Sequence, residues 1–254
     1  MGFLSSFFKQ KKVQEDLLPI NIAEYIKADI HSHILPGIDD GAKDIDQSVE
    51  LIEGLKDLGF CSLLCTPHVM TDFYRNSTET IKDKLDLVRN EIDKRNINIS
   101  IDAAAEYYFD EELRKRLSKK DIISFGKENY LLFEFSYFNE HQLIFETITD
   151  MVQAGYTPVL AHPERYPYYV MNLEKFDHLK SIGVKFQINL LSLNGNYGDS
   201  ALQGANYLIE KKFVDFIGTD IHKNGHLDGL KKVLNNEHLH NLVNSNILLN
   251  HTLI

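Results

Sequence analysis

The sequence predicts a distorted, seven-stranded α/β barrel. Short apolar runs alternate along the chain with longer amphipathic segments, which is the pattern of repeated strand–helix units. Such repeats imply parallel strands joined by right-handed crossovers. Neither G-x-G-x-x-G nor G-x-x-x-x-G-K-[ST] occurs in the chain, so an open nucleotide-binding sheet lacks support. We therefore expect the sheet to close into a barrel.

The expected strands are the short apolar runs. They lie at residues 28–34, 62–66, 99–105, 130–135, 157–161, 185–190 and 215–219. After the first strand, the segment "DQSVELIEGLKDLG" places Val49, Ile52 and Leu55 at helical spacing. Gly59 ends this segment and is a good stop signal, so we expect the first long helix here.

Three later segments repeat the helical scheme. "STETIKDKLDLVRNEIDKRN" follows the second strand, with Ser77 or Thr78 as its N-cap. "HQLIFETITDMVQAG" follows the fourth strand and stops at Gly155. "ALQGANYLIEKK" precedes the last strand. These segments supply the helices that a parallel sheet needs between its strands.

Length and composition indicate a single globular domain. The chain has 254 residues, of which 43% are hydrophobic and 25% charged, and these are ordinary values. No low-complexity linker divides it, so we expect one domain at residues 21–254 after a tail at residues 1–20. The tail, with phenylalanines before several lysines, either docks on the domain or contacts a membrane or a partner. A net charge of −10 disfavours nucleic acid, and no run is long enough to span a bilayer.

The two cysteines are expected to be structural. Cys61 and Cys65 lie in the apolar run "FCSLLCTP", which suits packing on a buried strand. Their small number suggests a reducing, cytoplasmic location without disulfides. A cysteine-based tyrosine phosphatase needs an arginine six residues after its nucleophile, but Pro67 and Thr71 stand at those two positions. We therefore expect neither cysteine to be catalytic.

Histidines and acidic residues follow six of the seven expected strands. They are His31, His33, His68, Glu106, Glu134, His162, Asp220 and His222, with Asp39 and Asp40 shortly after the first pair. The carboxyl ends of barrel strands share one face, so these side chains should converge. Imidazole and carboxylate ligands without thiolate suit zinc, manganese or iron. Because they are too many for one ion, we expect a cluster of two or three metals.

An arginine accompanies this set. Arg165 stands three residues after His162 in "HPER", and its planar guanidinium can hold two phosphate oxygens, the alternative being a surface ion pair. We expect Arg165 to be catalytic and to contact substrate together with Tyr166. Further aromatic residues either form walls for a flat leaving group or pack under loops; they are Phe73, Tyr74, Tyr168 and Tyr169.

Six motifs in order resemble the polymerase and histidinol phosphatase (PHP) family of metal-dependent phosphoesterases. They are "DIHSHILPGIDDGAKD", "CTPH", "AAAEYY", "LLFEF", "AHPER" and "TDIH", between about residues 28 and 225. Within that family they look like the bacterial tyrosine-protein phosphatases of capsule and exopolysaccharide operons. The resemblance implies a distorted seven-stranded barrel of PHP type.

The resemblance also implies the ligands of three metal ions. His31, His33, Glu106 and Asp220 would hold the first, Glu106, Glu134 and His162 the second, and Asp40, His68 and His222 the third. Asp40 is preferred to Asp39 because the family's ligand stands just before the glycine, here Gly41. One departure is visible: Val69 stands where many relatives have a second histidine, which leaves His68 itself intact.

The implied activity is metal-dependent hydrolysis of phosphotyrosine on a protein. The substrate would be the tail of a membrane-associated tyrosine kinase that regulates polysaccharide synthesis and export. The cofactors would be two or three divalent ions, manganese first, with zinc or iron as alternatives. A small-molecule phosphatase such as histidinol phosphatase and a non-catalytic, metal-stabilised regulatory module remain as other hypotheses. A nuclease is disfavoured because the chain is acidic and lacks a basic stripe.

Overall fold

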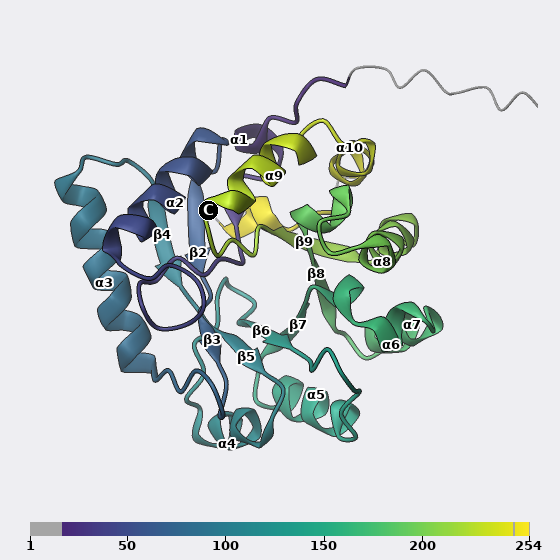
Figure 1. Ribbon diagram of the computed structural model, residues 1–254. Helices are drawn as coiled ribbons and strands as arrows, with labels where there is room; N and C mark the ends of the chain where they lie inside the picture. Colours follow the sequence, from purple (N-terminus) through teal and green to yellow (C-terminus); the bar gives the residue numbers. More distant parts are fainter. Residues whose placement is uncertain (1–16, 246, 254) are drawn as a thin grey trace, which may run out of the picture.

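A computed structural model describes residues 17–245 and 247–253 of the chain. Parallel strands occupy the centre of the molecule and helices surround them (Figure 1). One sheet has the order β1 (Ala28–Asp29), β2 (Ser62–Cys65), β4 (Ser100–Ala103). The other has the order β3 (His68–Val69), β5 (Glu106–Tyr108), β6 (Tyr130–Glu134), β7 (Thr157–Ala161), β8 (Lys185–Asn189), β9 (Val214–Gly218). The predicted α/β class with parallel strands is confirmed.

The helices follow the strands in chain order. The α-helices are α1 (Ile22–Tyr25), α2 (Ile45–Asp57), α3 (Thr78–Lys94), α4 (Glu111–Lys119), α5 (Ile144–Gln153), α6 (Pro167–Val170), α7 (Glu174–Ser181), α8 (Asp199–Glu210), α9 (Gly225–Val233) and α10 (Glu237–Asn244). Short 3-10 helices are η1 (Pro163–Arg165), η2 (Leu190–Asn194) and η3 (Asn250–Leu253). The amphipathic helices bury their apolar residues in the same hydrophobic core as the strands.

The expected helix signals act as predicted. Val49, Ile52 and Leu55 are buried on α2, and Gly59 follows this helix with a positive φ of +105°. The N-cap of α3 is Ser77, whose side chain accepts a hydrogen bond from the backbone N–H of Thr80. This settles the alternative between Ser77 and the next residue, since a β-region N-cap with a side-chain acceptor satisfies an otherwise free helix donor.

Two expected strands are each broken in two. The expected strand 62–66 continues after Pro67 as β3, and the expected strand 99–105 continues as β5. Pro67 has no backbone N–H and cannot donate to a ladder, which accounts for the first break. The second break, at Ala104 and Ala105, lies opposite the first in the parallel register. Isolated backbone hydrogen bonds join the two segments at the break; for example, the Glu106 N–H donates to Pro67 O at 3.1 Å. The break moves the chain from one sheet to the other, which is the distortion of the barrel.

The first expected strand is also shorter than predicted. Regular pairing ends at Asp29, and beyond it only an isolated parallel bridge joins Ser32 to Ile221. Side chains help to close the barrel here. The buried carboxylate of Asp29 accepts from the N–H of Thr219 at 2.9 Å, and the buried amide of Asn250 donates to the carbonyls of Ala28 and Ile217. Side-chain bonds therefore replace part of the ladder between the first and last strands.

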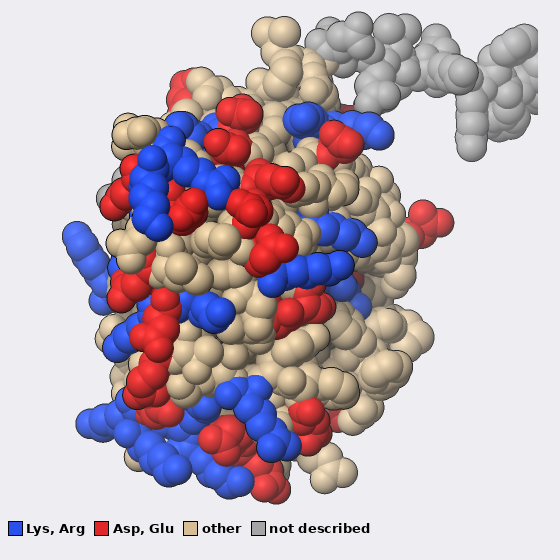
Figure 2. Space-filling view, turned by 60° about the vertical axis from the view of Figure 1, so that its left-hand side comes forward, with Lys and Arg blue, Asp and Glu red and all other residues tan. Residues whose placement is uncertain are grey.

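The N-terminal tail lies largely outside the described residues. Residues 17–20, which the sequence assigns to the tail, already contact the fold: the Ile20 N–H donates to Leu234 O at 2.8 Å. Among the described residues no helix is long and apolar enough to cross a membrane. The space-filling view shows lysine and arginine interleaved with acidic residues on the visible face, rather than a basic stripe (Figure 2).

Candidate metal centre

All nine ligand residues implied by the sequence motifs meet at the carboxyl ends of the strands. Their side chains form four groups in which the candidate ligand atoms lie within 4.8 Å of one another. The groups are His33–Asp40–His68–His222, His31–His33–Asp220, His31–Glu106–His162 and His68–Glu106–Glu134. The shared members make one continuous cluster, as the convergence of strand ends in a parallel barrel requires.

A buried polar relay fixes the orientation of His31. Its Nδ1 lies 2.7 Å from Gln187 Oε1, and the Gln187 amide donates to Asn189 Oδ1 at 2.9 Å. Asn189 in turn donates to Asp220 Oδ2 at 2.7 Å. Since the Gln187 oxygen can only accept, the proton of His31 is on Nδ1 and the Nε2 lone pair points into the cluster.

Asp39 fixes His33 in the same way. Its Oδ2 lies 2.8 Å from Nδ1 of His33, and its Oδ1 accepts from the Gly41 N–H at 2.9 Å. The Nε2 of His33 is thereby left as a lone pair facing inward. Asp39, set aside by the sequence analysis in favour of Asp40, thus orients a candidate ligand from behind.

These arrangements fit a metal ion. The Nε2 atoms of His31 and His33 are 3.2 Å apart, although both rings carry their proton on the other nitrogen. Glu106 Oε2 and Asp220 Oδ1 lie 3.3 and 3.5 Å from His31 Nε2. Neutral rings and carboxylates facing one another across a buried space repel unless a metal ion lies between them or the rings take up further protons. The donor set is that of a divalent ion bound by imidazole and carboxylate.

Two buried polar atoms without hydrogen-bond partners support the same conclusion. Glu106 is fully buried, and its Oε2 lies 3.0 Å from His68 Nδ1. Neither atom has a hydrogen-bond partner of acceptable geometry among the described residues. An unsatisfied buried polar atom costs about 1–3 kcal/mol, and a cation shared by both atoms would remove this cost.

The carboxylates of the cluster are held in their anionic form. Burial would raise the pKa of the Glu106 carboxyl, but the imidazoles of His31 and His68 hold it well below its usual range. For Asp220, burial likewise opposes ionisation, and His31 with other neighbours holds its pKa well below normal. Positive charge beside these carboxylates is therefore favourable, whether it is carried by protonated imidazoles or by metal ions.

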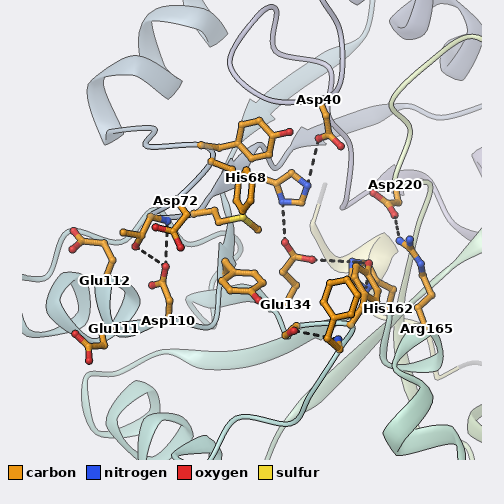
Figure 3. Close-up of a pocket in the computed structure, with 18 of the residues that line it drawn as sticks. Asp40, His68, Asp72, Asp110, Glu111, Glu112, Glu134, His162, Arg165 and Asp220 are labelled. Atoms are coloured by element: carbon orange, nitrogen blue, oxygen red, sulfur yellow. Dashed lines mark hydrogen bonds and ion pairs between the residues drawn. The ribbon is translucent and has the colours of Figure 1, made fainter.

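The group that contains Asp40, His68 and His222 is the most exposed. Asp40 Oδ1 lies 3.5 Å from His68 Nε2 and 3.4 Å from His222 Nε2. A hydrogen bond with His222, opposed by partial burial, lowers the pKa of Asp40 to about 2. The Asp40 side chain is 52% exposed, whereas those of Glu106 and Glu134 are 0% and 4% exposed. An ion held here would be the most accessible to solvent and to substrate (Figure 3).

Arg165 points into the same pocket. Its Nη1 donates to Asp220 Oδ2 at 2.9 Å, and its guanidinium lies over the rings of Tyr197 and Tyr137, 4.1 and 4.9 Å from their centroids. The ion pair expected as the alternative is therefore present, but it is partly buried and lies inside the pocket rather than on the outer surface (Figure 3). Burial would lower the pKa of Arg165, yet Tyr137, Asp220 and other neighbours raise it, so the group stays cationic.

The structure does not support the substrate contact predicted for Tyr166. Its ring is fully buried, and its hydroxyl donates to Ala161 O at 3.1 Å and accepts from the Phe135 N–H at 3.0 Å. Both contacts hold the loop after β7 against β6. Tyr168 and Tyr169 also pack under this loop, whereas Phe73 and Tyr74 line the pocket.

Sequence reasoning missed the residues that support the ligands. Gln187 and Asn189 lie on the one expected strand that carries no ligand, and both are fully buried. Two amides at the end of an otherwise apolar strand were a visible signal, because buried polar groups need partners. Tyr137 lay in the loop after β6 and carried no distinguishing pattern. Tyr137 lines the pocket, which has a volume of about 580 Å³.

Loss of these supports should weaken metal binding. Gln187→Ala and Asp39→Ala free the rings of His31 and His33, so each is expected to lower metal affinity by about 10–100-fold. Titration against a competing chelator measures this, with the exposed Gln203→Ala as the matched control. Unchanged affinity in both variants would show that the rings are held by packing alone.

Comparisons with known proteins identify a family and relatives of this chain. Residues 27–234 match the family described as "Capsular polysaccharide synthesis, CpsB/CapC". CapC of Staphylococcus aureus is 30% identical over 198 residues, covering 76% of each chain. The tyrosine-protein phosphatase YwqE of Bacillus subtilis is 29% identical over 194 residues, again covering 76% of each chain.

A solved structure extends the likeness to three dimensions. It comes from work on YwqE from Bacillus subtilis and CpsB from Streptococcus pneumoniae, described as unique metal-dependent tyrosine phosphatases. It superposes with a TM-score of 0.77 at 27% identity and covers 89% of this chain and 93% of its own. An amidohydrolase from Mycoplasma synoviae, at a TM-score of 0.53 and 13% identity, shares the fold alone. The chain belongs to the CpsB/CapC family of capsular polysaccharide synthesis.

Proposed function

We propose that this protein is a metal-dependent tyrosine-protein phosphatase. The observation that supports this most directly is one pocket that is lined both by members of the ligand cluster and by Arg165. Relatives in the same family carry the name tyrosine-protein phosphatase, and a structural neighbour is described as metal-dependent. The nine residues His31, His33, Asp40, His68, Glu106, Glu134, His162, Asp220 and His222 are the proposed ligands of two or three divalent ions.

Divalent ions bound at this site would supply an activated water and neutralise charge on the phosphoryl oxygens. Manganese is our first choice, and the imidazole–carboxylate donor set supports it together with zinc and iron. The chain's own residues position Arg165 for the substrate. Asp220 and the rings of Tyr137 and Tyr197 hold the Arg165 guanidinium in place, and its remaining N–H groups are available to bind phosphoryl oxygens.

The leaving group needs little help from an acid. A phenolate, with an ordinary pKa of about 10, departs more easily than an alkoxide. Tyr137 lies beside His162, its hydroxyl 3.4 Å from the ring Nδ1. Burial raises the pKa of Tyr137 well above its ordinary value, so its hydroxyl stays protonated and can only donate or accept a hydrogen bond here. The chemistry of the pocket thus suits an aryl phosphate.

We further propose that the substrate is a tyrosine kinase of the polysaccharide synthesis and export system, and that the protein acts in the cytoplasm. The family description supports the link with polysaccharide synthesis. Cys61 and Cys65 are both free thiols, consistent with a reducing compartment.

Substrate comparison tests the proposal. Metal-loaded protein is expected to hydrolyse a phosphotyrosine peptide with a kcat/KM well above those for histidinol phosphate and a phosphoserine peptide. Release of inorganic phosphate measures all three on one scale. A higher kcat/KM for histidinol phosphate would favour a small-molecule phosphatase, and binding of metal without turnover of any substrate would favour a regulatory module.

A further inference from the structure

We propose that the mouth of the metal pocket binds the polypeptide around a phosphotyrosine and selects segments with a basic residue close to it. This inference rests on the proposed phosphatase function and adds a substrate preference to it. The surface concerned is the outer wall of the pocket, which we call the aromatic–acidic wall: Phe73, Phe138, Asp72 and Glu111. All four line the same cavity as the ligand cluster.

The aromatic half of the wall is unusually exposed. Phe73 is 75% exposed and Phe138 is 94% exposed, and they come from different loops, after β3 and after β6. Burial of an exposed phenylalanine ring would be favourable in free energy, and a bound polypeptide would provide that burial. Two such rings at the mouth of one catalytic pocket are therefore placed for a partner with apolar surface.

A row of rings connects this wall with the metal site. The ring of Tyr74 stacks on that of His68 at 5.5 Å between centroids and 13° between planes. Phe73 continues the row, 6.5 Å from Tyr74. A phosphotyrosine ring that enters along this row places its phosphate at the ligands and leaves its backbone near the exposed phenylalanines. A small alkyl phosphate would reach the metal site without touching them.

The acidic half of the wall combines the loop after β3, which carries Asp72, with the start of α4, which carries Glu111; Asp110 and Glu112 lie beside them (Figure 3). Two of the four carboxylates there are already engaged. Asp110 caps α4 and accepts from Thr71, and Glu112 lies 3.7 Å from Arg116. Asp72 and Glu111 are exposed and have no ion-pair partner within 4 Å among residues 17–245 and 247–253.

One cation lies on the same wall. Lys115 also lines the cavity, one turn along α4 from Glu111, and no ion pair joins them in the described part of the chain. Glu112 is paired with Arg116, and Arg75 donates to the carbonyl of Thr71 beside this wall. Asp72, Asp110 and Glu111 still outnumber Lys115 and Arg75, so this end of the pocket is negative, while Arg165 and bound metal make the other end positive. A ligand that matches both ends carries a phosphate and, at some distance, a lysine or arginine.

Two peptides test the preference. They share one phosphotyrosine and differ only in having lysines or alanines beside it, and p-nitrophenyl phosphate serves as a substrate without flanking residues. The wild type is expected to prefer the lysine peptide about three- to tenfold in kcat/KM. Asp72→Asn with Glu111→Gln should remove this preference. Phe73→Ser with Phe138→Ser should lower the ratio of peptide to p-nitrophenyl phosphate turnover by about tenfold for both peptides.

Matched controls distinguish the effect of the aromatic–acidic wall from that of the overall negative charge. The net charge of −10 attracts any cationic peptide, so the exposed Glu53→Gln on α2 measures that contribution. Met171→Ser, 81% exposed and away from the pocket, is the control for loss of an exposed apolar side chain. Neither control should change the ratios.

The outcomes distinguish the inference from the proposed function. Hydrolysis of p-nitrophenyl phosphate with equal kcat/KM for both peptides, or with wall variants that behave like their controls, overturns the inference and leaves the phosphatase intact. Absence of turnover of all three substrates by metal-loaded protein overturns the phosphatase and the inference together.

Discussion

Removal of divalent metal is expected to abolish turnover of a phosphotyrosine peptide, and added manganese should restore it. The physical reason is the arrangement of His31, His33, Glu106 and Asp220, whose imidazole nitrogens and carboxylate oxygens face one another at the spacing of a shared metal ion. Glu106→Gln should have a comparable effect, because it removes the buried carboxylate shared by two of the candidate groups. Metal content by elemental analysis and initial rates of phosphate release are the measurements.

The cysteines supply the control for this experiment. Burial raises the pKa of the Cys65 thiol, so it stays protonated and unreactive, while Cys61 is exposed. The double substitution Cys61→Ser and Cys65→Ser should therefore leave the chemical step unchanged, apart from a packing cost at the buried position. Full activity after exhaustive chelation, or loss of activity in the double variant with metal still bound, would contradict the metal mechanism.

The candidate ligands could be predicted from sequence because strand order and chain direction decide where they lie. His68, Glu134 and His162 are each near the carboxyl end of a short apolar run, and parallel pairing takes all such ends to one face. The convergence of these strand ends depends on neither side-chain packing nor exact strand boundaries. It therefore holds even though two of the expected strands are broken.

The breaks themselves depend on contacts that periodicity does not reveal. The expected strand ends at Thr66, before Pro67, but periodicity does not show that the chain changes sheets there. Thr66 bonds to Ser32, a partner 34 residues away, through its N–H and through its Oγ1. Long-range bonds of this kind arise only when the barrel closes, so local pattern cannot predict them.

The prediction for Tyr166 failed for a related reason. An aromatic residue beside Arg165 in sequence suggested a place in the pocket, but the turn of η1 and the hydroxyl bonds to Ala161 and Phe135 direct the ring into the core. Tyr137 and Tyr197 flank the guanidinium instead, from loops 28 residues before and 32 residues after it in the chain. Adjacency in sequence was a poor guide because these rings reach Arg165 through the fold.

Arg165→Ala is expected to lower kcat/KM for a phosphotyrosine peptide by roughly 10²–10³-fold, the scale of losing one oxyanion donor. The guanidinium lies in the pocket with one Nη1 contact to Asp220, and its other donors are available as negative charge redistributes on the phosphoryl group. Metal content should stay close to the wild-type value, because Asn189 still donates to the same Asp220 oxygen at 2.7 Å.

The variant Arg165→Lys distinguishes bidentate hydrogen bonding by the guanidinium from the effect of positive charge alone. Lysine keeps the positive charge but offers a point donor in place of a planar fork, and it loses the flat contact with the rings of Tyr137 and Tyr197. It should therefore recover little of the activity. If Arg165 served only as an ion pair for Asp220, both variants would lose stability and metal affinity while the metal-saturated enzyme kept its kcat. Steady-state kinetics at saturating metal, with bound metal counted in parallel, decides between these roles, and unaltered kinetics in the alanine variant would exclude Arg165 from the active site.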